Sequence, residues 1–97
     1  MGNLCDWPEI RKIADKNNLI VIEDSADTLG ATINNQSSGY YSDMSITSFY
    51  GSHIINGAGN GGMVCFNKKE LYEKALLLRS WGRSSSLFKE GSEKIEN

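Results

Sequence analysis

The sequence has few of the features that mark specialised classes of protein. Its 97 residues include two cysteines, one histidine and one proline, and the formal net charge is only −2. Because neither sign of charge is concentrated, we expect no nucleic-acid partner and no attraction to an anionic membrane surface. The longest apolar runs, 19–22 and 75–78, are far shorter than the ~20 residues of a membrane span. With no signal peptide visible at the start, we predict a cytoplasmic protein.

The two cysteines give no reason to expect a disulfide framework or a metal site. Cys5 and Cys65 are far apart and have no cysteine or histidine neighbour at metal-ligand spacing. We therefore predict two reduced thiols, with Cys65 buried in a strand, and no metal.

Local signals predict helices that alternate with strands. A helix is expected to begin near Asp6, which can cap it, with Pro8 in the first turn, where its missing N–H costs little. The continuous apolar run 19–22 is typical of a strand covered on both faces. Further strands are expected at 44–49 and 62–66.

A second helix is expected after Asn67, which with Glu70 resembles a capping box. In the polar connector before the second strand, 31–33 and 40–41 could pair as a short hairpin. This order predicts an α/β fold with a mostly parallel sheet and flanking helices.

The predicted elements are too few to close a domain. Three core strands and two helices leave strand edges and one face of the sheet uncovered, so we expect part of a larger fold. The serine-rich and charged residues 85–97 are expected to form a mobile tail.

Polar side chains follow the first two predicted strands where each ends. Asp24 and Asp27 come after the first strand, Ser48 closes the second, and His53 follows before a glycine-rich turn at 57–62. The carboxyl ends of parallel strands form the ligand crevice of such sheets. A carboxylate there could pair with a protonated ring nitrogen, and Ser48 with backbone amides could hold a phosphate. These are the contacts that pyridoxal phosphate requires.

Simpler interpretations remain open on position alone. Asp24 and Asp27 could instead cap the following turn, and a lone histidine is more often structural than catalytic. The glycine-rich turn contains no Gly-Lys-Ser and opens no helix, which argues against a nucleotide P-loop.

Four segments taken together resemble the DegT/StrS family of pyridoxal-phosphate-dependent sugar aminotransferases. They are VIEDSADTLGA at 21–31, SFYGSH at 48–53, GNGGMV at 59–64 and RSWGR at 79–83. The resemblance implies that 1–84 is part of the large, cofactor-binding domain of a fold-type I (aspartate aminotransferase-like) enzyme. It also implies that Asp24 contacts the pyridine nitrogen, that Asp27 lies near the ring oxygen and that Ser48 binds the phosphate.

His53 departs from the common pattern of that family. Ordinary members carry there the lysine that binds the cofactor covalently, whereas a histidine resembles the subgroup of nucleotide-sugar 3-dehydratases. The resemblance then implies a non-covalently held pyridoxamine phosphate, with His53 as the base. Histidine, with a reference pKa of about 6.5, is mostly neutral at pH 7, unlike lysine at about 10.4. The implied reaction is C3 dehydration of a nucleotide-linked 4-keto-6-deoxyhexose, in deoxysugar and lipopolysaccharide biosynthesis.

Two alternatives accompany this hypothesis. The protein could be a nucleotide-sugar aminotransferase in which His53 is a divergent substitution, or a truncated, non-catalytic piece of either enzyme. The family's upstream phosphate-binding segment and C-terminal domain are not among these residues, so we expect the chain alone to be inactive. Since a second subunit completes active sites in this family, the resemblance implies a homodimer for the full-length protein.

Overall fold

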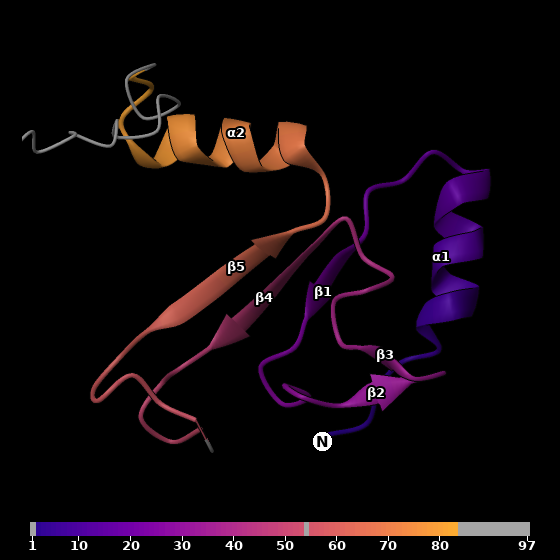
Figure 1. Ribbon diagram of the computed structural model, residues 1–97, viewed down its shortest axis with the longest axis horizontal. Coiled ribbons are helices and arrows are strands. Elements are labelled where there is room, and N and C mark those ends of the chain that lie inside the picture. Colours follow the sequence, from indigo (N-terminus) through magenta and orange to yellow (C-terminus); the bar gives the residue numbers. More distant parts are fainter. Residues whose placement is uncertain (1, 54, 84–97) are drawn as a thin grey trace, which may run out of the picture.

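The computed structural model describes residues 2–53 and 55–83 and contains two helices and five strands (Figure 1). In chain order the elements are α1 (Trp7–Lys16), β1 (Ile22–Asp24), β2 (Thr32–Ile33), β3 (Gln36–Ser37), β4 (Met44–Ser48), β5 (Gly62–Phe66) and α2 (Lys69–Arg79). Neither of these helices is long and apolar enough to cross a bilayer. The tail expected at 85–97 lies outside the described residues.

The main sheet has the strand order β1–β4–β5. β1 and β4 run parallel, with Ile22 opposite Met44 and Asp24 opposite Ile46, whereas β4 and β5 are antiparallel. The predicted parallel pairing thus occurs between β1 and β4. Because these two strands point the same way, the chain leaves both of them at one edge of the sheet.

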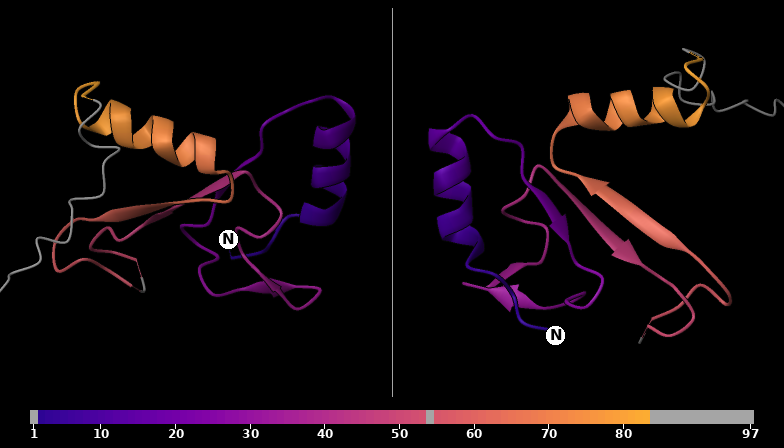
Figure 2. Two further views of the ribbon diagram at one scale, coloured as in Figure 1. Left: turned by 45° about the horizontal axis from the view of Figure 1, so that its top comes forward. Right: turned by 180° about the vertical axis from the view of Figure 1, so that it is seen from behind.

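The two helices lie well apart, α1 beside β1 and α2 beyond the end of β5 (Figures 1 and 2). The predicted cap of α1 is confirmed, since Asp6 Oδ1 accepts a hydrogen bond from the Glu9 amide at 3.2 Å. The capping box predicted for α2 is wrong. Lys68 occupies the N-cap position without a side-chain cap, and the side-chain Nδ2 of Asn67 donates to the carbonyls of Gly39 and Ser42, both at 2.7 Å.

The apolar run 19–22 is not a strand covered on both faces. β1 begins only at Ile22, and Leu19, Ile20 and Ile22 are all more than half exposed, while Val21 is buried. The prediction of a buried Cys65 is also wrong, because this side chain is exposed on β5. Burial on both faces requires a layer on each side of the sheet, and the described elements do not supply both.

The short hairpin forms, but with a different partner from the predicted one. Thr32 pairs with Ser37 and Ile33 with Gln36, so 40–41 takes no part. Asn34 and Asn35 form the turn with φ of 51° and 61°. Asparagine tolerates this left-handed conformation, and two such residues make the tight turn that suits a two-residue hairpin.

Most of the buried side chains in the described part are polar. Ala14 and Val21 are the buried apolar residues, beside buried Glu23, Ser25, Ser42 and Asp43. Since burying a polar group is costly unless it is hydrogen-bonded, these residues must be held by specific partners.

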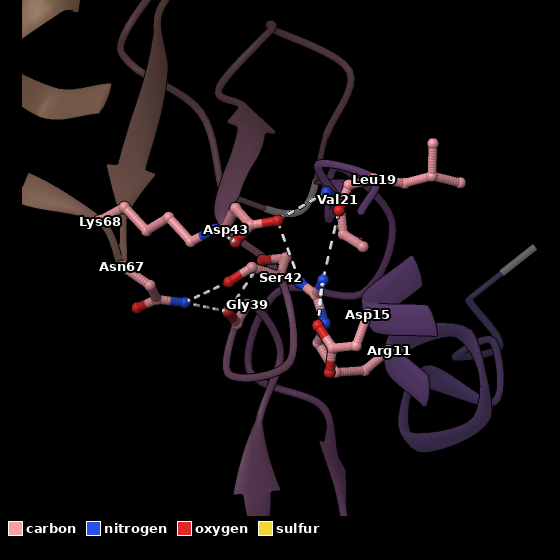
Figure 3. Close-up of polar contacts among 9 residues, drawn as sticks. All are labelled: Arg11, Asp15, Leu19, Val21, Gly39, Ser42, Asp43, Asn67 and Lys68. Atoms are coloured by element: carbon pink, nitrogen blue, oxygen red, sulfur yellow. Dashed lines mark hydrogen bonds and ion pairs between the residues drawn. The ribbon is translucent and has the colours of Figure 1, made fainter. Parts of the chain in front are cut away.

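Asp43 is the centre of this polar packing and joins three parts of the chain (Figure 3). Its carboxylate accepts from Lys68 Nζ at 2.6 Å, from Arg11 Nη1 at 3.0 Å and from the Val21 amide at 2.7 Å. Burial acts to raise the pKa of Asp43. The hydrogen bonds from Lys68, Val21 and Arg11 outweigh that effect and hold the pKa well below its usual range.

Gly39 combines a left-handed backbone with a close neighbour, which gives a testable prediction. Its φ is +88°, and a Cβ would lie 2.8 Å from Ser45 Oγ. Gly30 has a similar φ of +84° but no atom within 4 Å of such a Cβ. We expect Gly30→Ala to cost about 1–2 kcal/mol through backbone strain alone, and Gly39→Ala to cost measurably more in urea unfolding. Equal losses would show that the contact with Ser45 is relieved by rotation of the serine.

Candidate functional site

A hollow of about 130 Å³ opens at the sheet edge where β1 and β4 end. It is lined by side chains from the turn after β1, from the last residue of β4 and from the loop that follows: Ala26, Asp27, Leu29, Ser48, His53 and Ile55. The structure therefore brings together three of the four residues predicted from the sequence. Asp24, the fourth, lies at the end of β1 and does not line this hollow.

The turn after β1 holds the two acids in different ways. Asp24 is exposed, and its Oδ1 accepts from the Ala26 amide at 3.0 Å, while its Oδ2 makes no hydrogen bond within the described residues. The Thr28 amide donates to the Ser25 carbonyl at 3.1 Å, which closes the turn and turns Asp27 toward β4. Asp24 thus caps the turn, as the simpler interpretation holds, and keeps one oxygen available for a ligand.

Glu23 supports this turn from inside the protein, and the sequence analysis did not single it out. Its side chain is 1% exposed, with Oε1 accepting from the Ser25 hydroxyl at 2.9 Å and Oε2 from the Gly39 amide at 2.7 Å. Adjacent residues of a strand face opposite sides, so an exposed Asp24 implies an inward Glu23. This alternation was the feature of the sequence that could have indicated a buried Glu23.

Ser48 lies at the end of β4, half-buried, where the chain enters the glycine-rich loop. Its Oγ accepts from the Tyr50 amide at 3.2 Å, so the hydroxyl hydrogen remains able to donate to a ligand. The Phe49 amide donates to the Gly61 carbonyl at 2.8 Å, and the Gly57 amide to the Phe49 carbonyl at 2.9 Å. These bonds fold the loop back against the end of the sheet.

His53 is half-buried and belongs to a turn closed by its own amide, which donates to the Tyr50 carbonyl at 3.0 Å. The Tyr50 ring meets the imidazole edge to face, with 6.3 Å between ring centres. On the other side, His53 Nδ1 lies 3.7 Å from Asp27 Oδ1. The imidazole therefore contacts a ring from its own loop and lies within ion-pair distance of a carboxylate from the turn after β1.

The groups around the hollow suit a small anionic ligand with a basic ring better than a metal ion. No trio of histidine, cysteine or acidic residues with metal-binding geometry occurs among the described residues. A carboxylate, a hydroxyl donor and an imidazole are present instead. Ligand pockets usually have volumes of ~300–1,000 Å³, so a hollow of about 130 Å³ is one wall of a site rather than a whole one.

Comparison with protein families decides which fold this arrangement belongs to. Residues 1–95 match the DegT/DnrJ/EryC1/StrS aminotransferase family. The chain belongs to this family. The resemblance predicted from the four sequence segments is confirmed.

Curated relatives include enzymes with different named reactions. The chain is 42% identical over 81 residues to GDP-perosamine synthase of Caulobacter vibrioides, covering 84% of this chain and 22% of the relative. It is 42% identical over 83 residues to the lipopolysaccharide biosynthesis protein RfbH of Salmonella typhimurium, covering 86% and 19%. It is 36% identical over 83 residues to dTDP-4-dehydro-2,6-dideoxy-D-glucose 3-dehydratase of Saccharopolyspora spinosa, covering 86% and 18%. The chain spans about a fifth of the length of these relatives.

Solved structures agree on the fold. An aminotransferase from Psychrobacter cryohalolentis superimposes with a TM-score of 0.80 at 34% identity, covering 92% of this chain and 23% of that one. A histidine-to-asparagine variant of GDP-4-keto-6-deoxymannose-3-dehydratase with bound GDP-perosamine gives a TM-score of 0.78 at 31% identity, covering 93% and 23%. Bacillus subtilis NtdA with bound pyridoxamine phosphate gives 0.64 at 29% identity, covering 78% and 17%. The chain thus has the α/β fold of part of a fold-type I aminotransferase.

Proposed function

We propose that this chain forms one wall of the cofactor and sugar site of a pyridoxamine-phosphate-dependent nucleotide-sugar enzyme. The reaction we propose is removal of the C3 hydroxyl, as water, from a nucleotide-linked 4-keto-6-deoxyhexose. The observation that supports it best is the identity of the side chains at the hollow. His53 lines it beside Asp27 and Ser48, and none of the lining residues within 2–53 and 55–83 is a lysine.

The residues at the sheet edge fit the cofactor's two polar ends. The free Oδ2 of Asp24 can accept a hydrogen bond from a protonated pyridine nitrogen, and the carboxylate's charge favours that protonated form. The Ser48 hydroxyl can donate to a phosphate while its oxygen still accepts from the Tyr50 amide. Asp27 lines the same hollow, and the family resemblance implies that it lies near the cofactor's ring oxygen.

His53 supplies the proton acceptor that the reaction needs. When bound, the cofactor supplies a primary amine for the sugar ketone and an electron-withdrawing ring. An imidazole does not hold the cofactor covalently as a lysine amine does, so His53 is free to take a proton in each turnover. A neutral histidine can do so at pH 7 without losing a proton first.

An aminotransferase is the second candidate, because relatives named GDP-perosamine synthase share up to 42% identity with the chain. Amination in this family would normally involve a lysine at the position of His53. The nearest lysines in sequence are Lys68 and Lys69, after β5. Lys68 is bound to Asp43 at the opposite end of β4 from Ser48, so it does not substitute for the missing amine.

Product analysis separates the two candidates. The protein that carries this chain within the complete family fold is incubated with pyridoxamine phosphate and a GDP- or CDP-linked 4-keto-6-deoxyhexose. We expect a 3-deoxy-4-keto product that is lighter than the substrate by one oxygen atom, detected by mass spectrometry, and no amino sugar. The two electrons that this product requires would come from pyridoxamine phosphate, which would be recovered as pyridoxal phosphate with release of ammonia. An aminated product would refute the dehydratase assignment and favour the second candidate.

The 97-residue chain alone provides a further prediction. Because the described hollow is only one wall of a site, we expect no turnover and no saturable binding of pyridoxal phosphate in an absorbance titration. Saturable micromolar binding would show that these residues suffice to hold the cofactor. For the complete protein we expect a cytoplasmic location and a homodimer. Analytical ultracentrifugation can test the dimer.

A further inference from the structure

We propose that Asp27 is a positioning residue that holds His53 in the Nδ1–H tautomer, which leaves Nε2 as the nitrogen that accepts the proton. The part of this inference that concerns proton transfer rests on the proposed function. The tautomer itself is a property of the chain that can be measured without turnover.

The two side chains meet although 26 positions separate them in the sequence. Asp27 belongs to the turn after β1, and His53 to the turn after β4, and the parallel pairing of these strands places both turns at one sheet edge. The Asp27 Oδ1 lies 3.7 Å from His53 Nδ1, which is within ion-pair range but longer than a hydrogen bond. The imidazole side chain is 26% exposed, so this contact is only partly open to water.

The surroundings of the ring distinguish its two nitrogens. Nδ1 faces the carboxylate, and the ring also lines the hollow where the ligand is proposed to lie. The Tyr50 ring packs edge to face against the imidazole and the turn hydrogen bond to the Tyr50 carbonyl fixes the backbone. Rotation of the ring away from Asp27 would have to change the contact with the Tyr50 ring.

The chemistry of a carboxylate then selects the tautomer. A neutral imidazole has one N–H and one lone pair, and an ionised carboxylate can only accept. If Nδ1 carried the lone pair, it would face the lone pairs of Asp27, which is repulsive. With the hydrogen on Nδ1 the contact is attractive, and Nε2 presents its lone pair to the reacting proton.

In a buried catalytic triad, loss of such an orienting carboxylate lowers turnover by about 10⁴-fold. The Asp27 side chain is 53% exposed, so solvent screens the interaction. We expect Asp27→Asn to lower turnover by about 10–100-fold with a much smaller change in KM for the nucleotide sugar. Asp27→Glu, which keeps the carboxylate, should recover part of that loss.

Nitrogen NMR of the imidazole tests the inference directly. His53 is the only histidine of the chain, so ¹⁵N-histidine labelling gives one assigned pair of ring signals. Spectra are recorded at about pH 8, above the ordinary titration range of histidine, on the chain if its amide spectrum is dispersed, and otherwise within the complete fold. In the complete fold, the His53→Asn variant identifies the signals.

We expect Nδ1 to resonate as a protonated nitrogen and Nε2 as an unprotonated one. In Asp27→Asn, whose amide can both donate and accept, the two tautomers should mix. The control Asp15→Asn removes an exposed carboxylate from α1, away from the hollow, and should leave the signals unchanged. A predominant Nε2–H form in the folded wild-type protein would overturn the inference. If that protein still dehydrates its substrate, the proposed function stands; an Nδ1–H form without dehydration would refute the function alone.

Discussion

Replacement of His53 by asparagine is expected to lower the rate of dehydration by about 10²–10⁴-fold, the usual contribution of a positioned general base. Asparagine is polar and of similar size, but it does not accept a proton at neutral pH. The half-buried turn that carries residue 53 is held by backbone bonds, so we expect the fold and the KM to change little. Turnover is measured as formation of the 3-deoxy-4-keto sugar by mass spectrometry.

The matched control for this variant is Lys69→Ala. Lys69 is exposed at the start of α2 and pairs with Glu73 on the surface, away from the hollow. We expect unchanged turnover, because no lysine takes part in the proposed proton transfer. Turnover in His53→Asn within threefold of the wild type, or a large loss in Lys69→Ala, would contradict the assignment of His53 as the base.

Removal of the Asp43 carboxylate is expected to cause the largest loss of stability of any single substitution considered for this chain. Breaking a buried ion pair costs about 3–5 kcal/mol. In Asp43→Asn, Lys68 would lose its ion pair and Arg11 would keep only the one with exposed Asp15. The Lys68 side chain is 47% exposed and can be solvated again, so we expect roughly 2–4 kcal/mol. Urea unfolding measures the difference.

Asp15→Asn is the control, because Asp15 pairs with the same arginine at 2.7 Å but is 66% exposed. Exposed pairs contribute about 0–1 kcal/mol, so this variant should be nearly as stable as the wild type. A comparable loss in both variants would mean that the charge of Arg11, and not the buried position of Asp43, determines the effect.

The same carboxylate gives the stability a specific dependence on pH. The pKa of Asp43 is lower in the folded state than in the unfolded chain, where an aspartate titrates near 3.9. Its contribution is therefore fully present above about pH 4 and is lost as the pH falls from there toward the folded pKa. The free energy of unfolding should fall more steeply with acid in the wild type than in Asp43→Asn. Parallel curves would contradict the lowered pKa.

Strands with ordinary local signals were predictable from the sequence. The predicted strand 62–66 coincides with β5, and the predicted strand 44–49 extends one residue beyond β4. The sequence also indicated that Ser48, Asp27 and His53 lie at one end of the sheet, because all three follow or close parallel strands. The positions where strands end were therefore a better guide to which residues line the candidate site than to which residues are buried.

Burial and side-chain partners were not predictable in the same way. An apolar run such as 19–22 predicts that a layer covers it, but the sequence does not say whether that layer comes from these residues. Asn67 has the sequence of a helix cap, yet Lys68 occupies the N-cap position and the side-chain Nδ2 of Asn67 donates to the Gly39 and Ser42 carbonyls. Tertiary partners of this kind override local propensity, and only the three-dimensional structure shows them.

The pairing of Val21 with Asp43 has a consequence at the far edge of the sheet. The Asp43 amide donates to the Val21 carbonyl, and the Asp43 carboxylate accepts from the Val21 amide, so β1 is pinned against β4 at a single alignment. A slip of two residues would keep each side chain on its face but move one strand by roughly 7 Å along the other. Asp27 and His53 would then be out of reach of each other, so the buried carboxylate of Asp43 sets the spacing of two residues at the opposite ends of these strands.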